Sequence, residues 1–392
     1  MTVIDRVKLN VFEYKVHNVG LDAGGFDTVY VPNSTLTWTK YAIRISDTDG
    51  ATGSYVALWG GTPMAFAQTR LLASRLLGRD ANHREQIFDD FKRALRQYDH
   101  MGHGAIDIAL WDLLGKRTGA SISALLGGYR ERLPAYASTM HGDRNGGLSS
   151  PADYANFAQH CSGLGYRAFK AHGWCEGKVE EERNLVLTLG KMVGGKMDLM
   201  LDPACHLRTL NDTIRVGKAC DEAGFLWLED PLRDCGTSIH AHRLLRDAIE
   251  TRILATEHVR GIEPKADFAI QGGTDILRAD PEYDMGITGC MKIAHLAEAL
   301  GMDVEIHGCG PAHRHCMSAI RNTSYYEIAL VGPKARNPLP EIYTCDYTDD
   351  LETVGEDGCV SVPTGAGLGV DYNWEYIEKN TVESYDFKRG SS

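Results

Sequence analysis

The sequence lacks several features that would place it in a specialised class of protein. Its ten cysteines are scattered singly, with no Cys-x-x-Cys pair, and so indicate reduced thiols rather than a disulfide framework. No uninterrupted apolar run approaches the roughly 18 residues that a membrane span requires. The first residues show no basic segment followed by an apolar one. We therefore expect a cytoplasmic protein with no signal peptide and no membrane partner.

An excess of positive charge is also absent. The 392 residues include 41 lysines and arginines against 53 aspartates and glutamates, and the net charge of −12 argues against nucleic acid as a partner. The densest group of zinc-type ligands has a spacing that matches no closed zinc site: Cys309, His313, His315 and Cys316. The length suits a barrel of about 250 residues with a second module.

Three short apolar segments of one design are present, and each ends in a carboxylate: Met197–Asp202, Phe225–Glu229 and Arg252–Glu257. The carboxylates lie 27 and 28 residues apart, which fits one strand, one helix and two loops of a βα unit. One carboxylate at a strand end is more often a helix cap, but capping has no reason to repeat on adjacent strands. Carboxylates that converge at a barrel mouth repel unless a cation lies among them. Their oxygens suit Mg²⁺, with Mn²⁺ as a substitute.

The rest of the chain divides into a first module, a region of alternating strands and helices, and a tail. Residues 1 to about 60 alternate apolar and polar side chains and predict a small antiparallel sheet, and residues 64–118 have helical period. We expect Lys15–Thr35, with its three glycines and one proline, to be a long loop that closes over a site together with Leu58–Pro63. From Leu133 onward, strand-like and helix-like segments alternate as in a parallel α/β fold. The tail from Gly332 is expected to fold back on the first module.

Further polar residues end other predicted strands. Asp280 and His307 are 27 residues apart, again one βα step, and an aspartate beside an imidazole makes a competent general base. Lys170 and His172 share one face of a strand, because side chains two residues apart point the same way. The Lys170 ammonium would stabilise an oxyanion. Glu327, on the eighth strand, would hydrogen-bond a substrate carboxylate or enediolate if it is protonated.

The order Lys-x-His, Asp, Glu, Glu, Asp, His, Glu on successive strands resembles the mandelate racemase group of the enolase superfamily. Four segments support a resemblance that covers essentially the whole chain: Ala105–Lys116, Ala124–Gly128, Leu228–Pro231 and Gly286–Gly289. It implies an α/β fold, a modified TIM barrel (β/α)7β with an α+β capping domain. Residues 1–128 would form the capping domain, 129–340 the barrel with the active site, and 341–392 a segment that completes the cap.

The resemblance also implies roles for individual residues. Asp202, Glu229 and Glu257 would be Mg²⁺ ligands, Asp280 and His307 a catalytic dyad, and Glu327 a hydrogen-bond partner of the intermediate. Superfamily sites use a lysine or histidine base with Mg²⁺ stabilising an ene-diolate. The racemases carry Lys-x-Lys where this chain has Lys170 and His172, and the sixth strand, in Gln271–Asp280, lacks the lysine of the lactone-forming branch. The missing lysine argues against the muconate cycloisomerase and dipeptide epimerase branches, and a histidine at position 172 opposite the His307–Asp280 pair resembles some sugar-acid dehydratases of the group.

We therefore expect a Mg²⁺-dependent dehydratase of an aldonate or aldarate, a hydro-lyase that removes the proton α to the carboxylate and gives a 2-keto-3-deoxy acid. The alternatives are a racemase, epimerase or cycloisomerase of a hydroxy or anhydro sugar acid by the same chemistry, and a non-catalytic sugar-acid binding protein. A metal-dependent amidohydrolase is disfavoured, because the first barrel strand, Leu133–Ser138, lacks that class's His-x-His.

The expected partner is a small carboxylate substrate, and six residues on predicted loops are candidates to contact it: His17, Asn18, Trp59, His141, Trp174 and His206. Since closed symmetric assemblies are the common state of soluble enzymes, we also expect a homo-oligomer.

Overall fold

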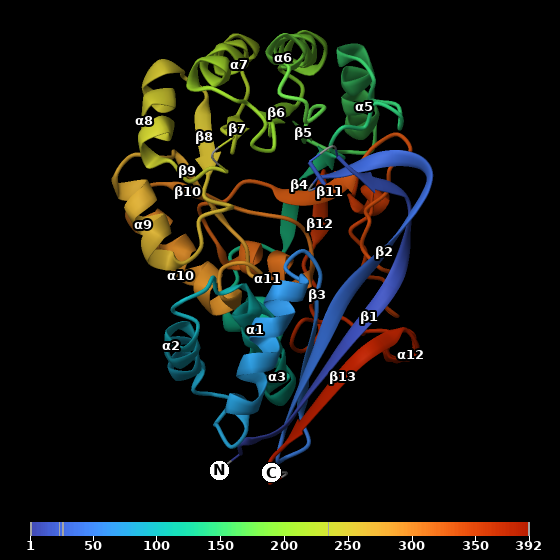
Figure 1. Cartoon of the computed structure of the whole chain (residues 1–392), viewed down its shortest axis with the longest axis vertical. Helices are drawn as coiled ribbons and strands as arrows, with labels where there is room; N and C mark the ends of the chain where they lie inside the picture. The colour runs from blue at the N-terminus through green and yellow to red at the C-terminus, as the bar shows by residue number, and fades with distance from the viewer. Residues whose placement is uncertain (1, 23, 26, 234, 391–392) are drawn as a thin grey trace.

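A four-stranded antiparallel sheet joins the two ends of the chain in the computed structural model, which describes residues 2–22, 24–25, 27–233 and 235–390. Its strand order is β13-β1-β2-β3, so the last strand pairs with the first (Figure 1). The strands are β1 (Ile4–Leu21), β2 (Thr28–Asp47), β3 (Thr52–Ala57) and β13 (Thr381–Lys388). The predicted return of the tail to the first module is confirmed.

The predicted loop Lys15–Thr35 is wrong, because most of it is strand. β1 and β2 continue as one long hairpin in which Val16 pairs with Leu36 and Val19 with Tyr30. The register shifts between these pairs, where Asn18 and Asn33 adopt positive φ angles of 59° and 62°. Asparagine tolerates this conformation, so the bulge accommodates the turn-forming residues without ending the strands. Residues 23 and 26, which also belong to the predicted loop, lie outside the described residues.

Helices cover one face of this sheet, as the helical period predicts. The helices of this region are α1 (Pro63–Ala73), α2 (Arg84–Ala94), α3 (Met101–Thr118) and the short α4 (Ile122–Leu125). α1 and α3 lie against the sheet, whereas α2 and α4 pack on α3. Thr62 caps α1 by accepting from the backbone N–H of Ala65, and α3 ends at Gly119 in the left-handed conformation. α3 packs directly on β3: a Cβ at Gly53 would lie 2.1 Å from the Ala109 carbonyl oxygen. Only glycine allows this approach.

Among the described residues the second sheet has nine strands, eight of which run parallel, and a helix follows each of the first seven parallel strands. The parallel strands are β4 (Arg132–Thr139), β5 (Ala168–Ala171), β6 (Asp198–Leu201), β7 (Trp227–Glu229), β8 (Arg252–Ala255), β9 (Ile276–Ala279), β10 (Asp303–Ile306) and β11 (Tyr326–Val331). The helices are α5 (Pro151–Gly163), α6 (Val179–Val193), α7 (Leu210–Ala223), α8 (Ile239–Ala248), α9 (Ile262–Ile270), α10 (Gly286–Ala299) and α11 (Pro311–Ala319). β4 to β10 pair in chain order and β11 pairs with β4, so the sheet curls as in a barrel. The predicted (β/α)7β fold is confirmed.

Two tail elements return to the body of the molecule. β12 (Cys359–Ser361) pairs antiparallel with β4, and α12 (Trp374–Lys379) precedes β13 (Figure 1). In the described part of the chain, no helix is both long and apolar enough to cross a membrane.

Candidate active site

The interior of the barrel changes from apolar to charged at the carboxyl ends of its strands. One layer takes a buried residue from each of six consecutive strands: Tyr136, Ala168, Met200, Trp227, Leu254 and Ile276. Side chains two residues further along a strand lie on the same face. In four of these strands that next inward residue is charged: Lys170, Asp202, Glu229 and Arg278. Because side chains alternate in direction along a strand, these charged groups point into the barrel at its mouth, where the active sites of barrel enzymes lie.

The three predicted metal-binding carboxylates end neighbouring strands. Asp202, Glu229 and Glu257 follow or close β6, β7 and β8, which are adjacent in the sheet. Asp230 joins them: its ligand atom lies within 4.8 Å of those of Glu257 and His258. Burial and then the charges of Glu257, Glu229 and Asp202 raise the pKa of Asp230 well above its ordinary value.

The donor set fits a hard divalent cation. Neither carboxylate oxygen of Asp230 has a hydrogen-bond partner among the described residues, although the side chain is buried. Leaving a buried carboxylate unpaired is costly, and a cation held by carboxylate oxygens removes that cost. No role was predicted for Asp230 from the sequence, although it directly follows Glu229 and lies within the segment Leu228–Pro231 that supports the resemblance.

Lys170 is the first of two buried cations in this cluster. Its ammonium lies 2.9 Å from a Glu229 oxygen, 3.0 Å from Glu327 and 3.5 Å from Asp202. Burial disfavours its charge, but Glu229 and Glu327 outweigh burial and raise the pKa of Lys170 well above its ordinary value. Lys170 is therefore a permanent positive charge beside the carboxylates.

The second cation, Arg278, was missed by the sequence analysis. Its guanidinium is fully buried and lies 2.7 Å from Glu229 and 3.2 Å from Glu327, and it donates to the Tyr136 hydroxyl over 3.1 Å. Arg278 shares a strand face with Asp280, so its inward direction could have been predicted from the alternation of β9. Five carboxylates, namely Asp202, Glu229, Asp230, Glu257 and Glu327, face these two cations. The remaining negative charge again favours a bound cation.

His172 presents one defined ring nitrogen to the cluster. Its Nδ1 lies 2.6 Å from the carbonyl oxygen of Thr139, which can only accept, so Nδ1 carries a hydrogen. Its Nε2 lies 3.2 Å from Asp202. The His141 ring packs on His172 with centroids 4.1 Å apart, and burial followed by His172 lowers the pKa of His141 to about 4. His141 is therefore a neutral group that supports His172 from the side.

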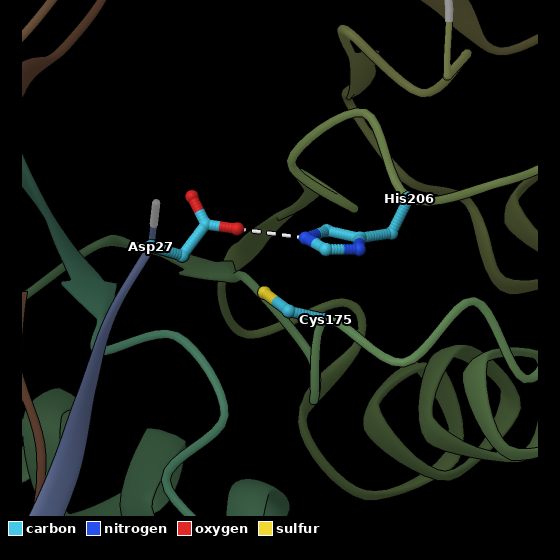
Figure 2. A group of neighbouring side chains, drawn as sticks. All are labelled: Asp27, Cys175 and His206. Carbon is cyan, nitrogen blue, oxygen red and sulfur yellow. Dashed lines mark hydrogen bonds and ion pairs between the residues drawn. The ribbon is translucent and has the colours of Figure 1, made fainter. Parts of the chain in front are cut away.

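His206 lies on the loop after β6, close to the end of the capping hairpin. Its Nε2 lies 2.7 Å from the carboxylate of Asp27, which immediately precedes β2 (Figure 2). The hydrogen bond with Asp27 raises the pKa of His206. The predicted substrate-binding residue thus contacts the capping hairpin.

Three of the predicted substrate-binding residues have side chains that contact other parts of the protein. His17 and Asn18 belong to β1 rather than to a loop; His17 contacts Thr35 and Asn18 accepts from the Asn33 backbone. The indole of Trp174 is buried and donates to the Leu148 carbonyl over 2.7 Å. His17 and Asn18 thus contact neighbouring residues of the hairpin, and Trp174 packs in the core.

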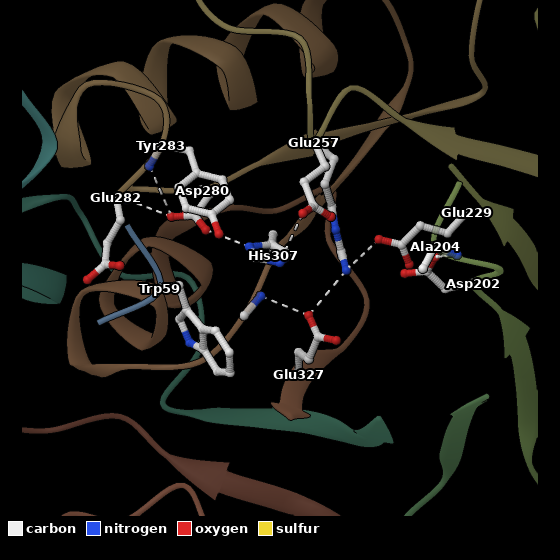
Figure 3. A network of polar contacts seen from close by, with 12 residues as sticks. Trp59, Asp202, Ala204, Glu229, Glu257, Asp280, Glu282, Tyr283, His307 and Glu327 are labelled. Atoms are coloured by element: carbon white, nitrogen blue, oxygen red, sulfur yellow. Dashed lines mark hydrogen bonds and ion pairs between the residues drawn. The ribbon is translucent and has the colours of Figure 1, made fainter. Parts of the chain in front are cut away.

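His307 and Asp280 form the predicted pair on the other side of the mouth (Figure 3). The His307 Nδ1 lies 2.7 Å from Asp280 and its Nε2 3.4 Å from Glu257. Burial opposes the charge of the ring, but Glu257 and Asp280 prevail and raise the pKa of His307 to about 9. The other Asp280 oxygen accepts from the backbone N–H of Glu282 over 2.6 Å, which fixes the carboxylate.

Two aromatic rings flank His307. Tyr283 stacks on it at 5.1 Å and Trp59 meets it edge-on at 6.4 Å between centroids. Trp59 donates to the Cys309 carbonyl, and Glu282 accepts from the backbone N–H groups of Leu58 and Gly60, so the predicted lid segment Leu58–Pro63 is hydrogen-bonded to the barrel. Trp59 thus lies beside the candidate base, where the sequence analysis expected a substrate contact.

Glu327 is held as an anion on β11. It accepts from the Gly308 backbone over 2.8 Å and pairs with Lys170 and Arg278. Burial raises the pKa of Glu327, but Lys170 and Arg278 more than reverse this and hold it well below its ordinary value. The protonated form considered from the sequence is therefore disfavoured, and Glu327 is an acceptor.

Comparison with known proteins gives the family. Residues 33–127 match the family model "Mandelate racemase / muconate lactonizing enzyme, N-terminal domain", and residues 153–376 match "Enolase C-terminal domain-like". The chain is 29% identical over 349 residues to 3,6-anhydro-alpha-L-galactonate cycloisomerase of Streptomyces coelicolor, covering 87% of this chain and 91% of that one. It is 26% identical to D-gluconate dehydratase of Thermoproteus tenax, covering 92% and 74%.

The fold is similar to that of solved structures. The crystal structure of D-glucarate dehydratase from Agrobacterium tumefaciens complexed with magnesium superimposes with a TM-score of 0.84 at 26% identity, covering 97% of this chain and 99% of that one. The second family model alone spans more than half of the 392 residues. The chain therefore belongs to the mandelate racemase / muconate lactonizing enzyme family of the enolase superfamily.

Proposed function

We propose that this protein is a dehydratase that removes water from an aldonic or aldaric acid and gives a 2-keto-3-deoxy acid. One observation supports this above all. His172 follows β5 and His307 follows β10, on opposite parts of the curled sheet, and each has one ring nitrogen fixed by a partner and the other facing the carboxylates. Dehydration needs one group that takes a proton and a second that gives one to the leaving oxygen.

Asp202, Glu229 and Glu257 would hold Mg²⁺, with Asp230 beside them. When bound, the ion supplies a Lewis acid for the substrate carboxylate. The magnesium in the crystal structure of the D-glucarate dehydratase supports Mg²⁺ as the metal, and Mn²⁺ is a substitute with the same preference for oxygen ligands.

The chain's own residues carry the proton transfers. One histidine takes the C2 proton, and the Lys170 ammonium stabilises the negative charge that moves onto the substrate carboxylate. The electron pair then forms the C2–C3 double bond as the C3–O bond breaks, and the second histidine protonates the departing hydroxyl. The resulting enol becomes the 2-keto-3-deoxy acid by moving a proton from oxygen to C3. The configuration of the substrate at C2 and C3 decides which histidine is the base.

A screen of aldonic and aldaric acids with Mg²⁺ tests this proposal. We expect at least one acid to give a 2-keto-3-deoxy product that semicarbazide detects, with a mass lower than that of the substrate by one water. His307→Asn should abolish product formation but still bind the acid. A screen in which no acid loses water would contradict the proposal.

Cycloisomerisation is the second candidate, and it is favoured by the 29% identical cycloisomerase of Streptomyces coelicolor. That reaction also begins with loss of a proton next to a carboxylate, but its product has the mass of its substrate. Anhydro sugar acids and lactones belong in the same screen for this reason. A product with the same mass as its substrate, and no loss of water from any acid in the screen, would favour the cycloisomerase over the dehydratase.

A further inference from the structure

Three side chains outside the proposed reaction meet beside the barrel mouth, and they come from three separate segments. Asp27 precedes β2 of the capping hairpin, Cys175 lies on the loop after β5, and His206 on the loop after β6. One ligand atom from each lies within 4.8 Å of the others. Asp27 and Cys175 are buried, each about 9% exposed, and the His206 side chain is 26% exposed.

The three groups are oriented as metal ligands rather than as a nucleophilic relay. In a relay, the imidazole uses one nitrogen for the carboxylate and the opposite nitrogen for the thiol. Here the Sγ of Cys175 and the carboxylate of Asp27 lie on the same side of the His206 ring, toward Nε2 (Figure 2). Three donors around one point, with an exposed side for a water, match the three-ligand arrangement of open zinc sites.

The charges around the group also favour a cation. After burial, four carboxylates raise the pKa of the Cys175 thiol: Asp27, Glu182, Asp202 and Asp22. This surrounding negative charge attracts a cation, and a metal ion bound between the three groups would stabilise the thiolate form of Cys175. Mg²⁺ prefers oxygen ligands only, whereas sulfur, nitrogen and oxygen together suit a borderline ion such as Zn²⁺.

We propose that Asp27, Cys175 and His206 bind a transition-metal ion of the Zn²⁺ class, separate from the Mg²⁺ site, and that this ion fastens the capping hairpin to the barrel mouth. On binding, the Cys175 thiol gives its proton to solvent and the sulfur becomes a thiolate ligand. The hydrogen that His206 Nε2 donates to Asp27 also leaves, the neutral ring keeps one hydrogen at Nδ1, and Nε2 binds the metal in place of Asp27. In a tetrahedral site the ligand atoms lie roughly 3.3–3.8 Å apart, so Asp27 and His206, now at 2.7 Å, need only separate by about 1 Å. This second metal site does not depend on the proposed dehydratase reaction.

Co²⁺ is the probe that tests this site, because a thiolate ligand gives a near-ultraviolet charge-transfer band that carboxylate ligands do not. The full chain, reduced and saturated with Mg²⁺, is titrated with Co²⁺. We expect the band to saturate at one ion per chain and Zn²⁺ to displace it. Cys175→Ser should abolish the band, and Cys205→Ser, next to His206, should retain it as the matched control.

A second variant is needed because Cys175→Ser would also lose the band if it failed to fold. Asp27→Asn should keep the thiolate band but weaken Co²⁺ binding about tenfold or more. Zn²⁺ should slow hydrogen exchange at the end of β1 and the start of β2 in the wild type but not in Asp27→Asn. The proposal is overturned if the wild type shows no band, if the band survives in Cys175→Ser, or if Asp27→Asn binds as tightly as the wild type.

Discussion

Arg278 connects the two halves of the polar cluster at the barrel mouth. Its guanidinium pairs with Glu229 from β7 and Glu327 from β11, and neither its own side chain nor that of Glu229 is exposed to solvent. Removing one partner of a buried ion pair leaves the others without compensation, which costs far more than the loss of a surface pair. Arg278 should therefore be essential for the stability of the barrel as well as for the position of Glu229.

We predict that Arg278→Met lowers the free energy of unfolding by about 3–5 kcal/mol. Arg252→Met is the matched control, because Arg252 also lies on a barrel strand and pairs with Asp303, but its side chain is 41% exposed. Its loss should cost less than about 1 kcal/mol. Urea unfolding measures both, and equal losses in the two variants would contradict the structural role of Arg278.

The partners of Arg278 show where residue-level prediction stops. Its direction follows from the period of β9, which is local information. Glu229 and Glu327 are 49 residues away in the chain on either side, and only the order of strands around the sheet makes them neighbours. The contact between His206 and Asp27, which are 179 residues apart, was likewise not predictable, because it depends on where the hairpin of β1 and β2 ends.

At the scale of elements, the ends of β6, β7 and β8 should hold Mg²⁺. We predict that Glu257→Gln weakens Mg²⁺ binding at least about tenfold, since even changes to groups behind a ligand cost 10- to 100-fold. Isothermal titration of the metal-free protein measures this. Glu250→Gln, on the exposed turn before β8, is the control and should bind Mg²⁺ as the wild type does. Unchanged affinity in Glu257→Gln would contradict the assignment of Glu257 as a ligand.

The packing of α3 on α2 should make stability depend on pH. His103 lies between Phe88 and Phe91 at 5.4 Å and 5.5 Å, and its ring nitrogens have no hydrogen-bond partner within the described chain. Burial, followed by His100, lowers the pKa of His103 to about 3. An unfolded histidine titrates near 6.5, so the unfolded chain binds the extra proton between these values. The stabilisation is therefore complete above about pH 6.5 and is lost as pH falls toward 3.

We predict that His103→Leu removes this dependence. Between pH 7 and pH 5 the wild type should lose about 2 kcal/mol relative to His103→Leu, measured by urea unfolding at each pH. His83→Leu, at an exposed position before α2, should keep the pH dependence of the wild type. Parallel curves for the wild type and His103→Leu would show that His103 does not titrate differently in the folded state.

Helices and strands were predictable from the sequence where the pattern of apolar and polar residues repeated without interruption. The regular βα spacing of Asp202, Glu229 and Glu257 gave the strand ends correctly, and alternation gave the first sheet. Lys15–Thr35 failed because its glycines, proline and asparagines resemble a loop locally, while strand pairing across a bulge compensates for them. Pairing partners outweigh local preference in a hairpin, and the sequence does not show those partners directly.

At the scale of the whole molecule, the two sheets depend on contacts between the ends of the chain. β13 completes the first sheet by pairing with β1, and β12 pairs with β4 (Figure 1). The composition of the tail from Gly332 predicted that it folds back on the first module, but not which strands it pairs with. The expected homo-oligomer stays a prediction, which sedimentation would test. The curled sheet places His172 and His307, which are 135 residues apart in the chain, at the same mouth of the barrel.

That arrangement of two histidines across the mouth is the central claim, and hydrogen exchange at C2 of the substrate tests it most directly. The acid identified by the screen is incubated in D₂O with Mg²⁺ and each of two variants, His172→Asn and His307→Asn. Both should lose dehydration by orders of magnitude. The variant that keeps the base should still place deuterium at C2 without losing water, and the variant that lacks the base should do neither. Dehydration at the wild-type rate in either variant, or deuterium exchange in both, would contradict the account.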